Sequence, residues 1–511
     1  MNNRLFLALA CVLLIVRLPS LVQPMGADQG LYAYVGDRIL AGELPYRHAW
    51  DQKPPAIHYT YAALRAAWRS EAVVPFADLA IAAIVAALLY ALGGALAGHG
   101  AGQASAFLFL LLSDPSFWRL GGVAVRAQCE TFIAALITGA FLLLARSRTG
   151  PVAWKHVLAG VLLGAAFSFK YNTAVYVGAA LLSLWAWGKL TRGSVVALAA
   201  GFAVAPAVLL ALFAFRGAVP DLYDATIAYN LQYSGETYSG LRHAATYLLT
   251  FPVQHARVDS LWLLGGAGAA VLLVASFWTR ERLAGPAWVA AACLSIAING
   301  SRGLPQYFVQ ALPLLALTAG WAGTLLWSRK QVINLLVVAV VGYGVWRVSD
   351  FPKLAGNIAH DARYAAGRMT REAHLARYGD REQRKYSALA MAELATFIRS
   401  RTSEADRVYI FGFASGAYVQ SGRASASRFF WSRPVIVNFN RSKPGYGVYG
   451  LRSDLERVQP AIIALQLRDW APDVQDSAAF FMSTPSLAGY LAEHYARVGG
   501  PAGFDVWERR R

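Results

Sequence analysis

Long apolar segments separated by short loops are the feature that most constrains how this chain folds. A helix needs about 20 mostly apolar residues to cross the hydrocarbon core of a bilayer. Hydrophobic residues make up 57% of the 511-residue chain and charged residues 15%, whereas an ordinary soluble domain is about 25% charged. We therefore expect a polytopic α-helical membrane protein. The candidate spans are residues 4–22, 75–97, 103–115, 126–145, 156–171, 173–188, 194–215, 259–278, 286–300, 304–327 and 331–348.

Basic residues in alternate loops predict the orientation of these spans. Lys and Arg concentrate in cytoplasmic loops, and a cytoplasmic N-terminus places the basic loops on that side. The first apolar segment reads as an uncleaved signal anchor, because no small-residue cleavage site follows it. The alternation then places residues 23–74 and the chain beyond 349 on the outer face. The basic loop residues are Arg146, Arg148, Lys155, Lys189, Arg192, Arg280, Arg282, Arg329 and Lys330.

The formal charge of +18 does not indicate a nucleic-acid-binding protein. Much of that charge lies in short loops, without the basic domain and interleaved aromatic residues that nucleic acid requires. There it faces anionic lipid headgroups, so membrane lipids are the expected partner and nucleic acid is not. The cysteines, Cys11, Cys129 and Cys293, lack CxxC spacing and histidine partners. They predict small buried side chains, with no disulfide framework or zinc site.

The composition changes at about residue 349, which divides the chain into an apolar domain, residues 1–348, and a soluble domain, residues 349–511. A polar helical stretch over 358–401 and short β-branched or aromatic runs predict a small α/β domain. We expect strands in RVYIFGF (407–413), PVIVNF (434–439), PAIIALQL (460–467) and the final FDVWERRR (504–511). The GFASG turn at 412–416 lacks the spacing of a nucleotide-binding loop, which favours an ordinary strand-to-helix turn.

The first outer loop carries the strongest functional signal. Asp28 follows the first span directly, and an acidic residue beside the membrane is costly to dehydrate, so it marks a site by default. Glycine, proline and aromatic residues follow it, a composition that favours short helices at the interface. The alternative is that the tyrosines and tryptophan are interfacial anchors and that Asp51 and Lys53 form a solvated pair.

Residues 28–55, DQGLYAYVGDRILAGELPYRHAWDQKPP, resemble the first outer loop of polyprenyl-phosphate-sugar-dependent glycosyltransferases of the GT-C superfamily. The similarity is greatest to bacterial members of the dolichyl-phosphate-mannose protein mannosyltransferase family, which includes the lipid A aminoarabinose transferases. Segments 119–132, 164–170 and 302–313 resemble later parts of these proteins in order. The resemblance implies a GT-C fold of about eleven transmembrane helices, with the C-terminal α/β domain on the outer face.

Transfer from a lipid-phosphate sugar leaves an anionic phosphate, which needs cations rather than a general acid. Lys and Arg bind phosphate through charge-assisted hydrogen bonds. Arg126, Lys170 and Arg302 lie at the expected outer ends of spans, where the orientation rule does not explain them. They are the candidate donor-phosphate ligands, although Lys170 could instead extend its charge to the interface.

The acceptor hydroxyl must lose its proton as it attacks the anomeric carbon, so a carboxylate is needed as general base. By resemblance, Asp28 has that role and Glu130 positions the acceptor or supports Asp28; alternatively Glu130 pairs with Arg126 on one helix face. Base and phosphate on opposite faces of the sugar imply inversion. The expected substrate-binding residues are Tyr32, Tyr46, Asp51, Lys53 and Tyr307.

Two further features bear on the site. Many relatives have two adjacent acids after the first span, whereas this chain has Asp28-Gln29, so we expect metal-independent transfer without a cofactor. The loop 216–258 is rich in aromatic and amide groups and forms either an acceptor-side wall or interfacial packing. His243 and His255 in it do not indicate a metal site or a catalytic base.

The expected function is transfer of a sugar from a polyprenyl-phosphate donor to an envelope acceptor at the outer face of the plasma membrane. The acceptor could be a glycolipid, lipid A, a polysaccharide or a protein. The alternatives are a lipid-linked oligosaccharide polymerase or ligase, a membrane transporter, and an anchor for an outer binding domain. A transporter would place its ionisable groups near the bilayer midplane between related halves, and an anchor would not need so many spans.

Overall fold

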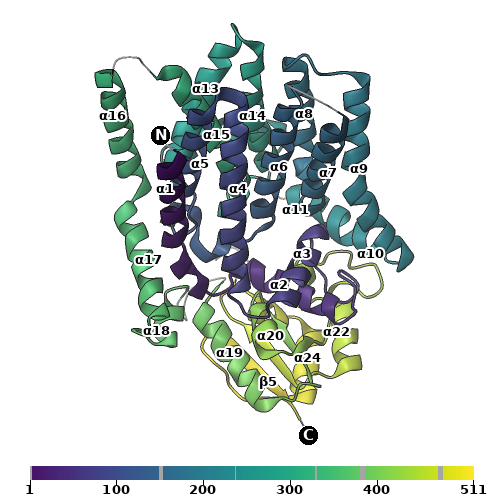
Figure 1. Cartoon of the computed structure of the whole chain (residues 1–511). Coiled ribbons are helices and arrows are strands. Elements are labelled where there is room, and N and C mark those ends of the chain that lie inside the picture. The colour runs from purple at the N-terminus through teal and green to yellow at the C-terminus, as the bar shows by residue number, and fades with distance from the viewer. Residues whose placement is uncertain are drawn as a thin grey trace.

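The computed structural model describes residues 3–148, 153–235, 237–327, 331–379, 386–469 and 476–510. A bundle of apolar helices carries a smaller mixed domain at one end, where the C-terminus lies (Figure 1). Each of the eleven expected spans overlaps one of the bundle helices, although Arg329 and Lys330 lie outside the described residues. These helices are α1 (Asn3–Val16), α4 (Val73–Ala97), α5 (His99–Leu112), α6 (Cys129–Arg146), α7 (Ala153–Phe169), α8 (Val175–Ala186), α9 (Arg192–Phe215), α13 (Ser260–Ser276), α14 (Ala284–Ile298), α15 (Leu312–Leu326) and α16 (Gln331–Ser349).

Length limits how many of these helices can cross a membrane alone. Among the described residues, six helical segments are long and apolar enough, or up to eight if each bent pair forms one span. One pair is α12 (Leu241–Ala256) with α13, bent by 117°, and the other is α16 with α17 (Phe351–Ala365), bent by 55°. Helices α5 and α7 are apolar but shorter. The protein is a multi-pass membrane protein, and its eleven crossings stay a prediction.

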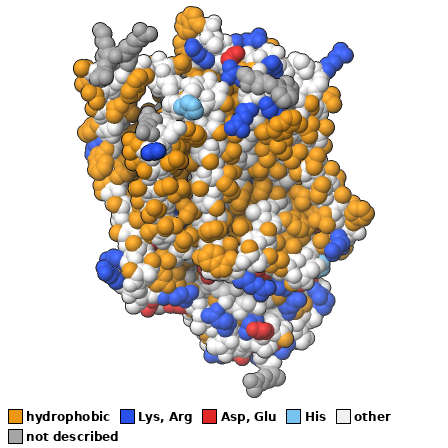
Figure 2. All heavy atoms as spheres, in the orientation of Figure 1, with side chains coloured by type: hydrophobic (Ala, Val, Ile, Leu, Met, Phe, Trp, Pro, Cys, Tyr) orange, Lys and Arg blue, Asp and Glu red, His pale blue; other side chains and the backbone are white. Residues whose placement is uncertain are grey.

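The surface supports this membrane assignment. Hydrophobic side chains cover the visible side of the bundle, while Lys and Arg gather at the end away from the C-terminal domain and on that domain itself (Figure 2). The cysteines are free thiols, but only Cys129 is buried; Cys293 is half-buried and Cys11 is exposed. The expectation of three buried cysteines is therefore wrong for Cys11. It lies in the first apolar segment, Asn3–Val22, in which only 17% of the most apolar 18 residues are buried inside the protein.

Small residues bring two bundle helices into close contact. A Cβ atom added at Gly164 of α7 would lie 2.1 Å from the carbonyl oxygen of Phe202 in α9. Likewise, a Cβ at Gly201 of α9 would lie 2.0 Å from the carbonyl oxygen of Val157 in α7. Membrane helices associate through such close backbone approach, because lipid supplies no hydrophobic drive between them.

The first outer loop folds into two helices, α2 (Ala27–Leu40) and α3 (Ala56–Ala67), which pack against each other. A Cβ at Gly36 of α2 would lie 2.8 Å from the backbone nitrogen of Ala62 in α3. The pair is also joined by ion pairing between Asp37 and Arg65 at 3.0 Å. The loop is therefore a rigid layer between the bundle and the C-terminal domain (Figure 1).

The C-terminal domain is built on a five-stranded sheet of order β2-β1-β3-β5-β4. Strands β1, β2 and β3 are parallel, and β5 pairs antiparallel with both β3 and β4. The strands are β1 (Arg407–Phe411), β2 (Ala424–Ser425), β3 (Ile462–Gln466), β4 (Tyr495–Arg497) and β5 (Phe504–Arg509). The helices are α18 (Arg371–Ala376), α19 (Ala388–Arg401), α20 (Gly416–Ser421), α21 (Arg433–Ile436), α22 (Gly447–Val458), α23 (Ser477–Ser483) and α24 (Pro485–His494).

Two sequence expectations for this domain need correction. The expected strand at 434–439 is wrong, because Pro434 lies in the first turn of the short helix α21, a position that proline favours. The helical stretch expected over 358–401 is divided among α17, α18 and α19. The turn at 412–416 does connect β1 to α20, as an ordinary strand-to-helix turn would.

Aromatic side chains join the C-terminal domain to the first outer loop. Trp50 is fully buried, and its ring lies 5.9 Å from that of Trp431 and 6.0 Å from that of Phe439. The backbone is engaged as well, because Trp50 donates its N–H to the carbonyl of Arg428, and the indole of Trp431 donates to the carbonyl of Trp50. The domain thus docks on the loop that carries Asp28.

Candidate functional site

Asp28 lies in the first turn of α2, where the helix dipole favours a carboxylate. Two side-chain amides from other elements donate to its Oδ2 atom. Gln128 Nε2 is 3.3 Å away and Gln306 Nε2 is 3.4 Å away. Tyr32 contributes indirectly, since its hydroxyl donates to Oε1 of Gln128 at 3.2 Å. Neutral amides therefore hold this carboxylate in place.

The surroundings make Asp28 a stronger base than an exposed aspartate. Burial raises the pKa of its carboxyl above the ordinary value. The charge of Lys53 and the hydrogen bond from Gln128 oppose this shift but do not cancel it. A carboxylate with a raised pKa accepts a proton more readily, which is the property required of a general base.

A cleft of about 240 Å³ lies near this carboxylate, although Asp28 itself is not among the residues that line it. Lys53 lines it, half-buried, and its ammonium is close enough to Asp28 to lower the pKa of that carboxyl. Among the described residues, no carboxylate lies within ion-pairing distance of the Lys53 ammonium. The cleft thus contains a cation available to an anionic ligand. Its lining residues are Gln52, Lys53, Pro54, Lys170, Tyr171, Asn172, Thr226, Ile227, Asn230, Leu231, Tyr233, Ile298, Asn299 and Tyr307.

Lys170 lines the same cleft but is already paired. Its ammonium lies 2.5 Å from Oε1 of Glu130, and both side chains are buried. The ammonium also lies 4.5 Å from the centre of the Tyr307 ring, a cation–π distance. The expected site residues Lys170, Glu130 and Tyr307 are therefore brought together, with Glu130 neutralising the lysine rather than pairing with Arg126.

Arg302 lies at the cleft rim, beside the wall residue Tyr233. Its guanidinium packs over the Tyr233 ring at 3.6 Å and donates to the Tyr233 carbonyl at 3.1 Å. This contact holds the planar guanidinium in place while leaving its charge on the same side of the molecule as Lys53. Arg302 therefore does not line the cleft itself, but it contacts Tyr233, which does.

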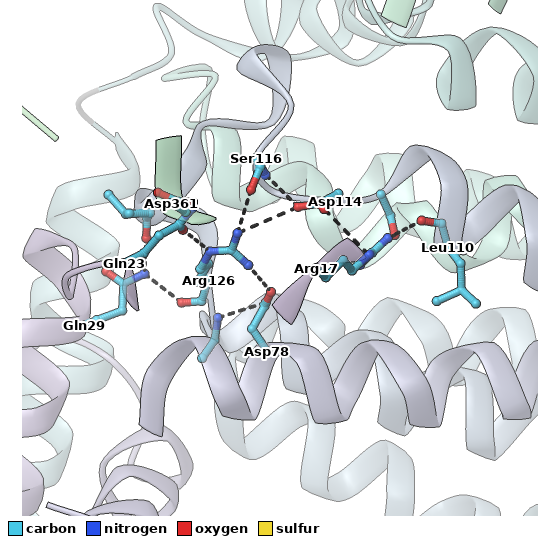
Figure 3. Close-up of polar contacts among 12 residues, drawn as sticks. Arg17, Gln23, Gln29, Asp78, Leu110, Asp114, Ser116, Arg126 and Asp361 are labelled. Carbon is cyan, nitrogen blue, oxygen red and sulfur yellow. Dashed lines mark hydrogen bonds and ion pairs between the residues drawn. The ribbon is translucent and has the colours of Figure 1, made fainter. Parts of the chain in front are cut away.

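Arg126 lies apart from the cleft in a buried network (Figure 3). Its Nε donates to Gln23 at 2.5 Å, and one terminal nitrogen lies 3.0 Å from Asp78. The other terminal nitrogen donates to Ser116 at 2.9 Å and lies 3.7 Å from Asp114. All three guanidinium nitrogens are thus occupied by this chain's own side chains, and Arg126 does not line the cleft.

Tyr46 and Asp51 shape the turn that presents Lys53. Tyr46 has a positive φ of 67°, is fully buried, and donates its hydroxyl to the carbonyl of Lys53 at 2.8 Å. Asp51 accepts from the backbone N–H of Gln52 at 2.7 Å and lies 3.3 Å from the imidazole of His58. Both residues were expected to bind substrate; in the structure their side chains contact this turn and His58, and the substrate-binding role stays a prediction.

Gln29 explains why this position is not acidic here. Its side-chain amide donates to the backbone carbonyls of Val123 and Arg126, at 2.9 and 2.7 Å. A carboxylate in its place could not donate either hydrogen bond. Gln29 therefore holds the second outer loop against α2.

Sequence reasoning missed the amides at this site. Gln128 and Gln306 occur inside the segments that carried the resemblance, but a search for charged chemistry passes over neutral side chains. The cleft wall also uses amides, since Asn230 donates to the carbonyl of Gln52 at 2.7 Å and Asn172 donates to the carbonyl of Ser295 at 2.7 Å. For Gln128 and Gln306, the signal available in the sequence was their occurrence in the same segments as the other expected site residues.

Part of the loop 216–258 lines the cleft, as one of its two expected roles requires. Asn230 and Tyr233 belong to α11 (Tyr229–Gly235), which forms one wall. Other residues of the loop face elsewhere: Tyr223 of α10 (Val219–Tyr223) is exposed, and Asp224 pairs with Lys443 of the C-terminal domain. The loop thus combines a cleft wall with a domain contact.

Solved glycosyltransferase structures share this fold. ArnT from Cupriavidus metallidurans bound to undecaprenyl phosphate gives a TM-score of 0.60 at 17% identity, over 99% of this chain and 97% of that chain. The Archaeoglobus fulgidus oligosaccharyltransferase in its apo form gives 0.51 at 11%, over 91% and 70%. The same organism's AglB, in complex with an inhibitory peptide and a dolichol-phosphate, gives 0.50 at 12%, over 100% and 75%.

These likenesses establish the fold. No family model and no curated protein sequence matches the chain. The chain therefore shares the fold of these proteins, a mostly helical membrane protein with a small sheet, which agrees with the architecture that the resemblance of its first outer loop implied.

Proposed function

We propose that this chain is an inverting glycosyltransferase that moves a sugar from a polyprenyl-phosphate donor to a cell-envelope acceptor at the outer face of the plasma membrane. One observation carries the proposal: a base-like carboxylate, Asp28, lies near a cleft lined by Lys53, whose ammonium is paired with no carboxylate in the part of the chain that the structure describes. The GT-C fold supports it, since the ArnT structure of that fold was solved with undecaprenyl phosphate bound.

In the proposed reaction, Asp28 accepts the proton of the acceptor hydroxyl as that oxygen attacks the anomeric carbon. The bond between the anomeric carbon and the phosphate oxygen breaks, and its electron pair leaves with the polyprenyl phosphate. Lys53 and Arg302 stabilise the developing negative charge by charge-assisted hydrogen bonds. The phosphate leaves without a general acid, and neither a metal ion nor another cofactor is needed in this scheme.

The remaining site residues support these groups. Glu130 keeps Lys170 fixed beside Tyr307, and this neutral ion pair holds the cleft wall in place. Tyr32 and Gln128 orient the Asp28 carboxylate. We assign Arg126 to a structural role rather than to the donor phosphate, because its nitrogens are all bonded within the protein.

Purified protein in lipid nanodiscs, supplied with a panel of radiolabelled polyprenyl-phosphate monosaccharides and envelope extracts, tests the proposal. We expect transfer by the wild type and a loss of about 10² to 10⁴-fold in Asp28→Asn, the usual contribution of a positioned base. Lys53→Met should weaken donor binding about 10- to 100-fold, because a hydrogen bond to a charged group contributes about 1.5–3 kcal/mol.

Lys353→Met is the matched control, since Lys353 is an exposed lysine outside the cleft. Transfer of single sugars separates the proposal from an oligosaccharide polymerase or ligase, which would require a lipid-linked oligosaccharide. Sugar uptake into proteoliposomes without transfer would instead identify a transporter. An active Asp28→Asn variant would remove the proposed base from the reaction.

A further inference from the structure

A second cluster of reactive side chains lies away from the cleft, in the connection between the bundle and the C-terminal domain. Helix α17 carries His360 and Asp361, and α18 carries His374. One possible metal-ligand atom from each of these residues lies within 4.8 Å of the other two. None of the three lines the cleft beside Asp28.

The imidazole of His374 is held in the form that can bind a metal. Its Nε2 lies 3.0 Å from the backbone carbonyl of Val22. A carbonyl only accepts hydrogen bonds, so Nε2 carries the proton and Nδ1 keeps its lone pair. Burial lowers the pKa of His374, which favours this neutral ring. Metal-binding histidines generally donate their other N–H to such an acceptor.

That Nδ1 atom has no hydrogen-bond partner, although His374 is only 1% exposed. A buried polar atom without a partner costs free energy and therefore calls for an explanation. The ring is also fixed, since Tyr364 stacks on it at 3.9 Å with planes 5° apart. The stacking holds the ring, and with it the Nδ1 lone pair, in one orientation.

His360 also has an imidazole nitrogen without a hydrogen-bond partner, and this residue is more exposed than His374. Its Nε2 atom is buried and without a partner, and its ring centre lies 5.3 Å from that of His374. The residue as a whole is half-buried, so it offers a path by which an ion could enter.

Asp361 supplies the negative charge. Its side chain is 1% exposed, and no basic side chain among the described residues lies within ion-pairing distance of it. It accepts hydrogen bonds from Gln23 at 2.6 Å and from the hydroxyl of Tyr378. Each carboxylate oxygen has a second lone pair, so these bonds orient the group without filling it.

We propose that His360, Asp361 and His374 bind a Zn²⁺ ion, with water as the fourth ligand. Two imidazole nitrogens and one carboxylate oxygen suit zinc, whereas Mg²⁺ and Ca²⁺ prefer oxygen ligands alone. Ligand atoms around tetrahedral zinc lie about 3.3 Å apart, since each is about 2.0 Å from the ion. The three candidate ligand atoms already lie within 4.8 Å of one another, so binding would draw them closer together.

The ion would join two parts of the molecule. Its ligands are already bonded to Val22 and Gln23 at the end of the first span, and Gln23 accepts a hydrogen bond from Arg126 (Figure 3). The nearby guanidinium of Arg377 opposes a cation, but Asn357 holds it by a hydrogen bond, and the Asp361 carboxylate offsets its charge. The site is therefore separate from the chemistry at Asp28.

The test uses full-length protein purified through a histidine-free tag, dialysed against EDTA, reloaded with ZnCl₂ and passed through a desalting column. Zinc is then measured by mass spectrometry. We expect about one zinc ion per chain in the wild type and a content lower by about fivefold or more in His360→Ala, which loses one of three ligands. His494→Ala is the matched control, because His494 is an exposed histidine of α24 and should leave the zinc content unchanged.

A second measurement covers the case in which a variant folds poorly. Added Zn²⁺ should raise the thermal unfolding temperature of EDTA-treated wild type and of His494→Ala, and should leave that of His360→Ala unchanged. Loading with Co²⁺ should give visible d–d absorption in the wild type and in His494→Ala, but not in His360→Ala. A wild type that binds no stoichiometric zinc after reloading, or a His360→Ala variant that retains the full content, would overturn the proposal.

Discussion

At the scale of single residues, environment separates two groups of carboxylates in this chain. Asp78 is bound to the guanidinium of Arg126, and Glu130 is bound to the ammonium of Lys170. Asp28 has no such cation bonded to it and is held by the amides of Gln128 and Gln306. A carboxylate paired directly with a cation is a poor base, so the unpaired Asp28 is the one suited to accept a proton.

The hydrogen bond from Gln128 makes a prediction about pH. Activity requires the deprotonated base, so it is present above the pKa of Asp28 and lost as the pH falls through it. Burial raises that pKa, and the Gln128 amide lowers it. Gln128→Met should therefore move the acidic limb of kcat/KM to higher pH, and the wild-type limb should already lie above the value of about 3.9 for a free aspartate.

Rates measured between pH 4 and 8 would show this shift. Gln254→Met is the control, because Gln254 is an exposed glutamine on α12. A limb that stays in place or moves to lower pH in Gln128→Met would show that another group controls the profile.

At the scale of elements, Arg126 holds several segments together. Its partners come from α4, from the segment that follows α1, and from the segment that follows α5 (Figure 3). Arg126→Ala would leave the buried carboxylate of Asp78 without its cation, and breaking a buried pair costs about 3–5 kcal/mol. We expect a lower free energy of unfolding with little change in donor affinity.

Thermal unfolding and donor binding, measured on the same preparation, check this prediction. Asp78→Asn added to Arg126→Ala should recover part of the stability, since the second change removes the uncompensated charge. Arg192→Ala serves as control, because Arg192 is exposed. Normal stability with weakened donor binding in Arg126→Ala would favour the phosphate-binding role that its sequence position suggested.

The crossing of α7 and α9 makes a second prediction at this scale. Gly164→Val would place side-chain atoms against the carbonyl oxygen of Phe202, which lies 2.1 Å from the Cβ position. The helices would have to separate, so we expect a clear fall in the unfolding temperature. Gly178→Val in α8 is the matched control, since no atom lies within 4 Å of its Cβ position. Equal unfolding temperatures for the two variants would contradict the close crossing.

At the scale of the whole molecule, hydropathy was enough to predict a mostly helical membrane protein, while the division into two domains at residue 349 stays a prediction. It could not reveal pairings between distant residues. Lys170 and Arg126 were chosen because they are cations at span ends, but their partners Glu130 and Asp78 lie 40 and 48 positions away in the chain. Lys53 and Asp28 lie close enough for their charges to interact, and the sequence could suggest this only because one short loop carries both; their roles stay a prediction.

The docking of the C-terminal domain is another feature that one sequence does not reveal. Ser425 donates its backbone N–H to the hydroxyl of Tyr34 on α2, and Trp431 donates to the carbonyl of Trp50. These bonds join residues 391 and 381 positions apart. Because the first outer loop and the domain are bonded in this way, both must lie on the same side of the membrane.

This shared face gives a prediction about topology. In a variant with Cys11, Cys129 and Cys293 replaced by alanine, single cysteines would be placed at three exposed positions: Arg69→Cys in the first loop, Glu404→Cys in the C-terminal domain and Thr279→Cys at the opposite end of the bundle. A membrane-impermeant maleimide should label the first two in intact cells, and the third only after permeabilisation. The physical reason is the concentration of Lys and Arg at the opposite end, which orients that end toward the cytoplasm.

Labelling of Thr279→Cys alone in intact cells would place Asp28 and its cleft in the cytoplasm, where the proposed outer-face transfer could not occur.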